Sequence, residues 1–175
     1  MSARREVDCC IAGGGPAGLV AGLLFARAGL KTLVLEKHAD FLRDFRGDTV
    51  HPSTLEIFHE LGLLQALLAR PHDQMPKLGV RFNGKYMPVA DFAGLPTQCR
   101  FVAFMPQAEF LDFVADEAER LPGFELMRST AATGLVEDGG RVTGLRAAGP
   151  DGELTVASRL AIGADGRHST VRELA

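Results

Sequence analysis

Residues 7–36 contain the feature that most limits what this chain can fold into: a strand, a glycine-rich turn, a helix and a second strand in direct succession. The apolar run Val7–Ala12 predicts a buried parallel strand. A second apolar run, Thr32–Leu35, predicts another strand, and Glu36 follows it. This order is typical of the βαβ unit of an open, mostly parallel α/β sheet.

The turn contains GxGxxG, in which each glycine has its own physical task. Gly13 permits a tight turn, Gly15 lets a pyrophosphate reach the backbone, and Gly18 lets helix and strand approach closely. The start of the helix offers unpaired N–H groups and a positive dipole to the phosphates. Glu36, which lies 18 residues after Gly18, can accept hydrogen bonds from a ribose diol. The unit therefore predicts dinucleotide binding, but it does not separate FAD from NAD.

Length and charge exclude several other classes of function. The chain has 175 residues, which is the size of about one domain, and a formal net charge of −3, which favours neither nucleic acid nor an anionic membrane as partner. No apolar run has the length of a transmembrane helix. We therefore expect a soluble, cytoplasmic protein.

Cysteines and histidines give no metal or disulfide signal. Cys9 and Cys10 are adjacent in the first strand, so they should point to opposite faces of the sheet and pack as small apolar groups. A redox or metal pair is the alternative, but neither a CxxC motif nor a matching histidine spacing supports it. We predict no metal site.

The middle of the chain reads as helices around an inserted hairpin. Ser53-Thr54-Leu55-Glu56 has the form of a capping box, which predicts a helix start near Ser53 and a bend or restart at Gly62. Asn83-Gly84 predicts a hairpin between short strands within 78–90. A strand over 100–105 and an amphipathic helix over 107–121 follow.

The last part of the chain reads as a meander and a final strand. We expect the meander strands at Glu125–Met127, Gly134–Val136, Val142–Ala147 and Leu154–Ala157. The final strand, Leu160–Ala164, leads into Asp165-Gly166.

Two loops stand at predicted strand ends, where open α/β sheets bind ligands. Arg46-Gly47-Asp48 follows the second strand, and its arginine could pair with a diphosphate or ribose oxygen. Asp165 and Gly166 could bind a ribityl hydroxyl or a water molecule. The alternatives are a solvated surface loop for the first and an ordinary turn for the second.

Four segments taken together resemble a known family: GGGPAG with Glu36, RGDTVHPSTLEIFHELGL, MPQAEFLDFV and IGADGRHSTVR. In this order they are similar to the para-hydroxybenzoate hydroxylase class of FAD-dependent monooxygenases. The resemblance implies FAD rather than NAD. It implies a Rossmann-like, three-layer α/β FAD-binding domain with an antiparallel β-meander, incomplete here, over 1–75 and 106–175. Residues 76–105 would then be a partial inserted β-sheet of the substrate domain.

The resemblance also assigns cofactor contacts by position. The glycine turn would line the pyrophosphate, Glu36 would hold the adenosine ribose, and Lys37 would lie beside the adenine. Arg46 and Gln107 would match family residues that reach FAD, and Asp165-Gly166 would form a motif implicated in binding FAD and reduced nicotinamide. The full predicted set is Gly13, Gly15, Pro16, Ala17, Gly18, Glu36, Lys37, Arg46, Gln107, Asp165 and Gly166.

The reaction implied by the family is carried by the flavin. NAD(P)H would reduce FAD, dioxygen would add at the flavin C4a carbon, and the hydroperoxide would hydroxylate an aromatic substrate. We predict no catalytic acid or base in this chain. Family members are considerably longer, so we expect an amino-terminal portion that is inactive alone. A non-hydroxylating flavin oxidoreductase, a halogenase and an inert FAD-binding fragment are the alternatives.

Overall fold

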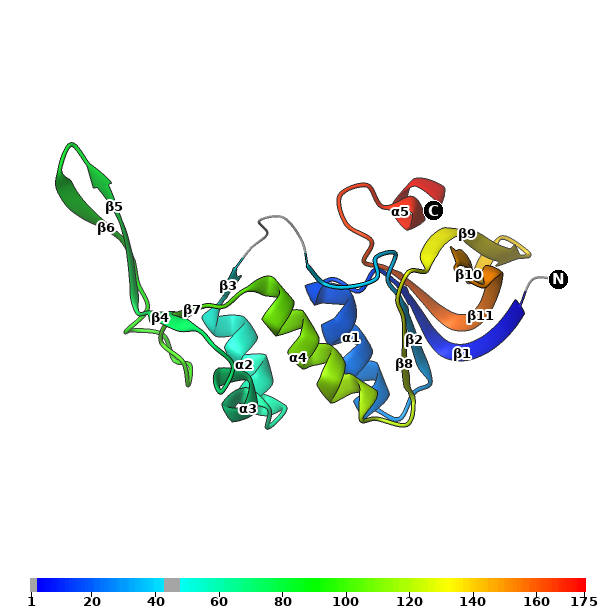
Figure 1. Ribbon diagram of the computed structural model, residues 1–175, viewed down its shortest axis with the longest axis horizontal. Coiled ribbons are helices and arrows are strands. Elements are labelled where there is room, and N and C mark those ends of the chain that lie inside the picture. Colours follow the sequence, from blue (N-terminus) through cyan, green and yellow to red (C-terminus); the bar gives the residue numbers. More distant parts are fainter. Residues whose placement is uncertain (1–2, 43–47) are drawn as a thin grey trace. The chain divides into compact units, whose positions relative to one another are not determined.

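The computed structural model describes residues 3–42 and 48–175 of the chain (Figure 1). The chain divides into two compact units. The first comprises Met1–Phe41 and Leu111–Ala175, and the second comprises Leu42–Phe110. The helix α4, Gln107–Glu119, contributes residues to both units.

The first unit is built on one six-stranded sheet with the order β8-β2-β1-β11-β10-β9. The strands β8, β2, β1 and β11 are parallel neighbours, and β11, β10 and β9 form an antiparallel meander. Helix α1, Pro16–Arg27, connects β1 to β2, and the short helix α5, Thr170–Leu174, follows β11. The strand bounds are β1 Ala3–Ala12, β2 Thr32–Leu35, β8 Phe124–Met127, β9 Ala131–Asp138, β10 Arg141–Gly149 and β11 Gly152–Gly163. The predicted class of a Rossmann-like α/β unit with a β-meander is confirmed.

The core of this unit confirms the interpretation of the adjacent cysteines. Cys10 lies in the apolar cluster that joins the parallel strands to the meander, together with Leu33 and Leu145. Cys9 points to the opposite face of β1 and is equally buried. Burial, with a smaller contribution from Asp8, raises the pKa of the Cys9 thiol to about 11. Burial likewise raises the pKa of Cys10 to about 12. Both thiols therefore behave as apolar packing groups.

Two strand predictions were wrong in their grouping. Residues 154–157 and 160–164 do not form two strands, because Gly152–Gly163 continues as the single strand β11 alongside β1. The segment Phe124–Met127 is not part of the meander, because β8 pairs in parallel with β2. Along the chain, the parallel strand β8 leads into the meander strand β9 through a turn at Ser129, a non-glycine residue with a φ of 53°. Neither glycine nor proline marks this turn in the sequence.

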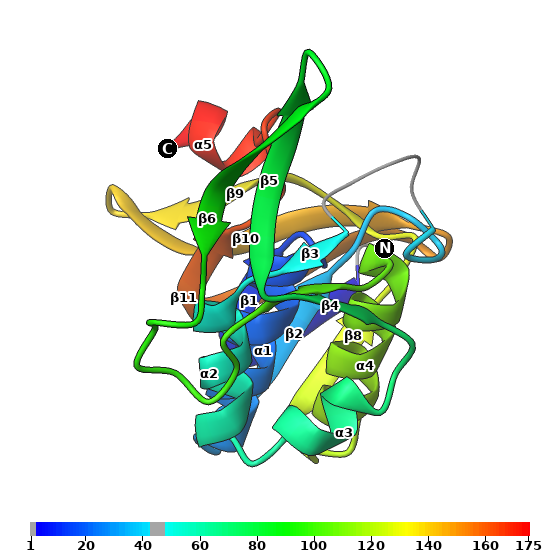
Figure 2. The ribbon, with the colours of Figure 1, turned by 90° about the vertical axis from the view of Figure 1, so that its left-hand side faces the viewer.

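The second unit contains two helices, a small sheet and a hairpin (Figure 2). Phe58 of α2 and Phe110 of α4 pack edge to face, with ring centroids 5.5 Å apart. Helix α2 begins at Pro52, so Ser53 lies inside the first turn, and the predicted capping box is wrong: His51 is the N-cap and no side chain caps it. Proline is well suited to the first helical position, so the helix begins one residue before the predicted Ser53. The bounds are β3 Thr49–Val50, α2 Pro52–Glu60, α3 Leu64–Leu68, β4 Asp73–Met75, β5 Lys77–Phe82, β6 Lys85–Asp91 and β7 Val102–Phe104.

The predicted hairpin is confirmed as a separate two-stranded sheet of β5 and β6. Asn83 and Gly84 have φ values of 48° and 76°, as a two-residue turn of this kind requires. The other sheet of this unit has the order β3-β7-β4. No helix among the described residues is long and apolar enough to cross a membrane.

Candidate functional site

The glycine turn lies where three parallel strands of the first unit end together. In the sheet, Ala12 at the end of β1 pairs with Leu35 of β2 and with Gly163 of β11. The Gly13 N–H donates to the Leu35 carbonyl at 2.7 Å, and the Ala164 N–H donates to the Ala12 carbonyl, also at 2.7 Å. These bonds fix the turn at the carboxyl edge of the sheet, which is where open α/β sheets bind ligands.

Two glycines of the motif are required by the protein's own packing. Gly13 has a φ of +102°, and a Cβ there would lie 2.4 Å from the Ala164 carbonyl oxygen. A Cβ on Gly18 would lie 1.8 Å from the Gly13 carbonyl oxygen. Any side chain at Gly18 would therefore push α1 away from the turn, so this glycine sets the close approach of helix and turn.

Gly15 is different, because neither its backbone nor a neighbour requires glycine. Its φ of −76° and ψ of −176° are extended values that any residue adopts. A Cβ there would meet no atom of the described chain within 4 Å. The space beside Gly15 is therefore open, and a Cβ there would displace no atom of the described residues.

The start of α1 adjoins this open space and is suited to an anion. Gly15 is the N-cap, Pro16 is the first helical residue, and the first turn carries no acidic residue. Among the described residues no side chain caps this helix. Pro16 and Ala17 are exposed, whereas Gly18 is buried. The N–H groups and positive dipole of the helix therefore face an open surface.

Glu36 is the buried acid of the site, and its carboxylate is held from two sides. Its side chain is only 8% exposed. Oε2 accepts a hydrogen bond from the Gly14 N–H at 2.8 Å, and Oε1 accepts one from the His38 N–H at 2.9 Å. The His38 ring atom Nδ1 lies 2.6 Å from the same Oε1. Glu36 therefore ties the loop after β2 to the glycine turn.

The protonation of Glu36 follows from these contacts. Burial alone would raise the pKa of this carboxyl group. The hydrogen bonds from the His38 N–H and ring and from the Gly14 N–H outweigh burial and hold the pKa of Glu36 below its ordinary value. Glu36 is therefore ionised near neutral pH, and both of its carboxylate oxygens can accept hydrogen bonds.

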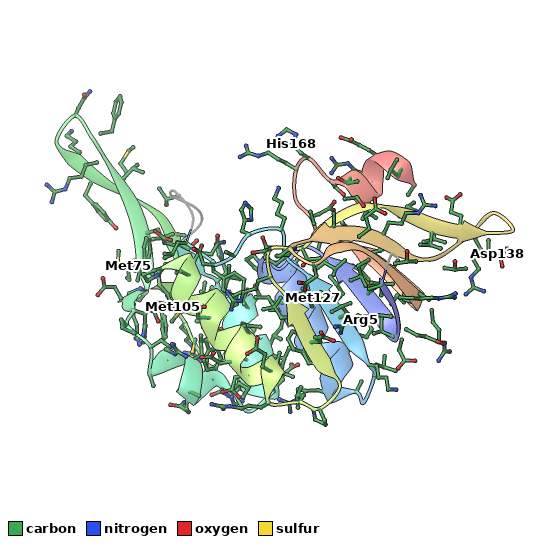
Figure 3. All side chains as sticks on the ribbon, turned by 45° about the vertical axis from the view of Figure 1, so that its right-hand side comes forward. Arg5, Met75, Met105, Met127, Asp138 and His168 are labelled. Carbon is green, nitrogen blue, oxygen red and sulfur yellow. The ribbon has the colours of Figure 1, made fainter. Side chains whose placement is uncertain are left out.

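The loop after β11 places Asp165 at the same edge of the sheet. Asp165 Oδ1 accepts a hydrogen bond from the Ser169 hydroxyl, and Oδ2 accepts one from the Val171 N–H at 3.2 Å. Ser169 in turn caps α5 by accepting from the Arg172 N–H at 3.0 Å. Gly166 is exposed and has a φ of +87°. His168 is also exposed on this loop (Figure 3).

The structure thus brings most of the predicted residues to one edge of the first unit: the glycine turn, Glu36 and Asp165-Gly166. Lys37 is exposed directly after Glu36. Gln107 belongs to the second unit, where its N–H donates to Asp48 Oδ1 at 3.2 Å. Arg46 lies outside the described residues. Within residues 3–42 and 48–175, no three His, Cys, Asp or Glu side chains are grouped as metal ligands would be.

Sequence reasoning missed two residues of this edge. His38 was not singled out, yet its ring contacts the acid that the motif singles out. The spacing Glu-x-His after a strand was the available signal, but it is too common to be diagnostic. Ser169 was not singled out either, although its hydroxyl contacts both Asp165 and the α5 backbone. Its position before a short helix was the signal for an N-cap.

Comparison with known families decides which cofactor site this is. Residues 6–175 match the family described as FAD binding domain. The chain belongs to this family. The matched residues include the glycine turn, Glu36 and the Asp165 loop of the first unit. The resemblance found in the sequence, to FAD-dependent aromatic monooxygenases, is confirmed.

Named relatives include two monooxygenases of Streptomyces rimosus. The chain is 32% identical to 6-methylpretetramide 4-monooxygenase over 97% of its length, and this covers 41% of the relative. It is 35% identical to 12-dehydrotetracycline 5-monooxygenase/anhydrotetracycline 6-monooxygenase over 95% of its length, covering 32% of that relative. The chain therefore spans about a third to two fifths of the curated relatives it matches.

Solved structures show the same fold. The anhydrotetracycline hydroxylase of Streptomyces rimosus superposes with a TM-score of 0.83 at 32% identity, covering 97% of this chain and 33% of the hydroxylase. The p-nitrophenol 4-monooxygenase of Pseudomonas putida superposes with a TM-score of 0.84 at 25% identity, covering 97% of this chain and 43% of the enzyme.

Proposed function

We propose that the first unit binds FAD with its diphosphate at Gly15 and the start of α1, and with its adenosine ribose at Glu36. The observation that carries this proposal is the open space beside Gly15. Gly13 and Gly18 are explained by contacts within the protein, whereas Gly15 has an ordinary backbone, and a Cβ there would meet no atom of the described chain within 4 Å. A glycine that the fold does not need is expected where a ligand approaches the backbone.

The remaining predicted residues have supporting roles in this proposal. Lys37 lies beside the adenine, and Asp165-Gly166 faces the ribityl chain or the reduced nicotinamide. Gln107 and Arg46 make further cofactor contacts. The FAD-binding domain comprises 1–75 and 106–175, and 76–105 belongs to a substrate domain. The separate hairpin sheet of β5 and β6 supports an insertion over Lys77–Asp91, whereas β7 pairs with β3 and β4.

The whole protein is proposed to be an FAD-dependent monooxygenase of the cytoplasm. Its reductant is NAD(P)H, its second substrate is dioxygen, and its organic substrate is an aromatic small molecule, as the names of the relatives suggest. Bound FAD supplies the electron-transfer and oxygen-transfer chemistry. The residues of this chain bind and orient it: Glu36 accepts from the ribose, and the α1 N-terminus neutralises the diphosphate. The three buried, free cysteines agree with a reducing compartment.

The test of FAD binding is a titration of the purified chain with FAD, followed by flavin fluorescence and by retention of flavin absorbance after gel filtration. We expect saturable binding with one FAD per chain. Absence of binding would contradict the proposal. A longer protein of the relatives' length would then test the activity, because hydroxylated product formed with NAD(P)H separates a monooxygenase from a halogenase or a plain oxidoreductase.

A further inference from the structure

The carboxylate of Glu36 already has at least three hydrogen-bond donors within the protein. The Gly14 N–H is 2.8 Å from Oε2, the His38 N–H is 2.9 Å from Oε1, and the His38 Nδ1 is 2.6 Å from Oε1. A ribose diol would add two more donors. A carboxylate has about four lone-pair positions. Five donors exceed this capacity, so at least one of the protein's donors has to leave when a diol binds.

The donor that can leave is the His38 ring. The Gly14 N–H belongs to the turn that Gly13 anchors on Leu35 at 2.7 Å. The His38 N–H is fixed as well, because the His38 carbonyl accepts from the Ser129 N–H at 2.9 Å. By contrast, the His38 side chain is 46% exposed, and rotation about its side-chain bonds would carry the ring into solvent.

We propose that the His38 ring competes with the adenosine ribose for Oε1 of Glu36, which makes His38 a positioning residue that sets cofactor affinity. This inference rests on the proposed FAD site. The competition depends on pH, since a protonated imidazole forms a charge-assisted bond to the carboxylate that is stronger than a neutral one. Histidine ordinarily changes charge between about pH 5 and 8. Acid therefore strengthens the competitor and weakens binding of the ribose.

Among the described residues, other charged groups flank His38 on its own loop and on the facing turn. Lys37 and Asp40 lie on its own loop, and Arg128 precedes Ser129 on the facing turn. The Arg128 guanidinium lies over the Phe41 ring, 4.1 Å from its centroid, and 3.9 Å from Asp112. The glycine turn carries no titratable side chain. All these groups are unchanged by a substitution of His38, so a comparison of variants isolates the ring.

The experiment measures the dissociation constant of FAD at pH 5.5 and pH 8.0 by calorimetry, for the wild-type chain, His38→Ala and His38→Gln. His59→Ala, which removes an exposed histidine of α2, is the matched control. We expect the wild-type and control dissociation constants to rise about fivefold to tenfold on acidification, as a charged donor gains about 1 kcal/mol over a neutral one. His38→Ala and His38→Gln should lack this rise, and His38→Ala should bind more tightly than wild type at pH 5.5.

A second ligand pair counts the donors directly. ADP carries the ribose diol, and 2′-deoxy-ADP carries one hydroxyl fewer, so the deoxy compound adds one donor fewer to Glu36. The pH dependence of binding through His38 should therefore be smaller for 2′-deoxy-ADP than for ADP. An equal pH dependence in wild type and His38→Ala, or weaker binding of His38→Ala at pH 5.5, would overturn the competition while leaving the FAD site intact. No FAD binding by wild type at either pH would overturn the proposed function, and this inference with it.

Discussion

Replacement of Gly15 by alanine should separate ligand binding from folding. The new methyl group would meet no atom of residues 3–42 and 48–175 within 4 Å apart from its own chain neighbours, and the backbone angles suit alanine. Alanine is a poorer N-cap than glycine, but it also reduces the entropy of the unfolded chain by about 0.4–1 kcal/mol. These effects oppose each other, so the free energy of unfolding should change by less than about 1 kcal/mol.

The matched variant is Gly18→Ala, three residues further along the same motif. Its methyl group would lie 1.8 Å from the Gly13 carbonyl oxygen, so backbone has to move. Overpacking of this kind destabilises by about 1–3 kcal/mol. Urea unfolding of both variants should therefore show a clear loss of stability for Gly18→Ala and little change for Gly15→Ala.

Gly15→Ala, which should leave stability nearly unchanged, should nevertheless weaken FAD binding. A methyl group in the path of the diphosphate should weaken binding by about 2 kcal/mol, which is about thirtyfold in the dissociation constant. The assay is the fluorescence titration with FAD at a temperature where both proteins are folded. Wild-type affinity in Gly15→Ala, or a loss of stability equal to that of Gly18→Ala, would refute the assignment of this glycine to the ligand.

Three further predictions concern the pH dependence, the thiols and the Asp165 loop. The folded-state pKa of Glu36 is below its ordinary value of 4.5, so its ionised form stabilises the fold above that pH and this stabilisation is lost as pH falls further. Glu36→Gln should therefore be less stable than wild type at pH 7, and its free energy of unfolding should fall less than that of wild type as the pH is lowered. Equal pH dependence of the two free energies of unfolding, measured in urea, would contradict this. Cys9 and Cys10 should not react with an aromatic disulfide reagent at pH 8 until the chain unfolds, because their pKa values are raised to about 11 and 12 and both are buried; rapid labelling of the native chain would show this wrong. Asp165→Ala removes the acceptor of two hydrogen bonds and should destabilise the chain by about 1–2 kcal/mol in urea unfolding, whereas an unchanged midpoint would mean that the loop does not depend on these bonds.

The sequence was most informative where a local pattern and the fold agree. The strand Thr32–Leu35 was predicted with its observed bounds, because all four residues are apolar or small and all are buried. The Asn83-Gly84 hairpin was equally clear, since its turn depends only on those two residues. The glycine motif likewise predicted the tight turn at Gly13 and the close approach of the helix at Gly18.

Predictions were weaker where distant residues decide the structure. Nothing local shows that β11 continues past Ser158, because that continuation depends on its parallel pairing with β1. The pairing of β8 with β2 is equally non-local. Glu36 was singled out as a ribose acceptor from its spacing, but its contacts with Gly14 and His38 depend on the turn and loop being folded against each other. That contact of the His38 ring could only be found in three dimensions.

The central claim, that FAD binds with its diphosphate at the glycine turn, is tested most directly by ¹⁵N-resolved NMR of the chain during a titration with FAD. The account predicts saturable shifts that are largest at the amides of Gly13, Gly14, Gly15, Ala17 and Gly18, with further shifts at Glu36 and His38. Saturable binding that leaves these amides unmoved, or no binding at all, would contradict it.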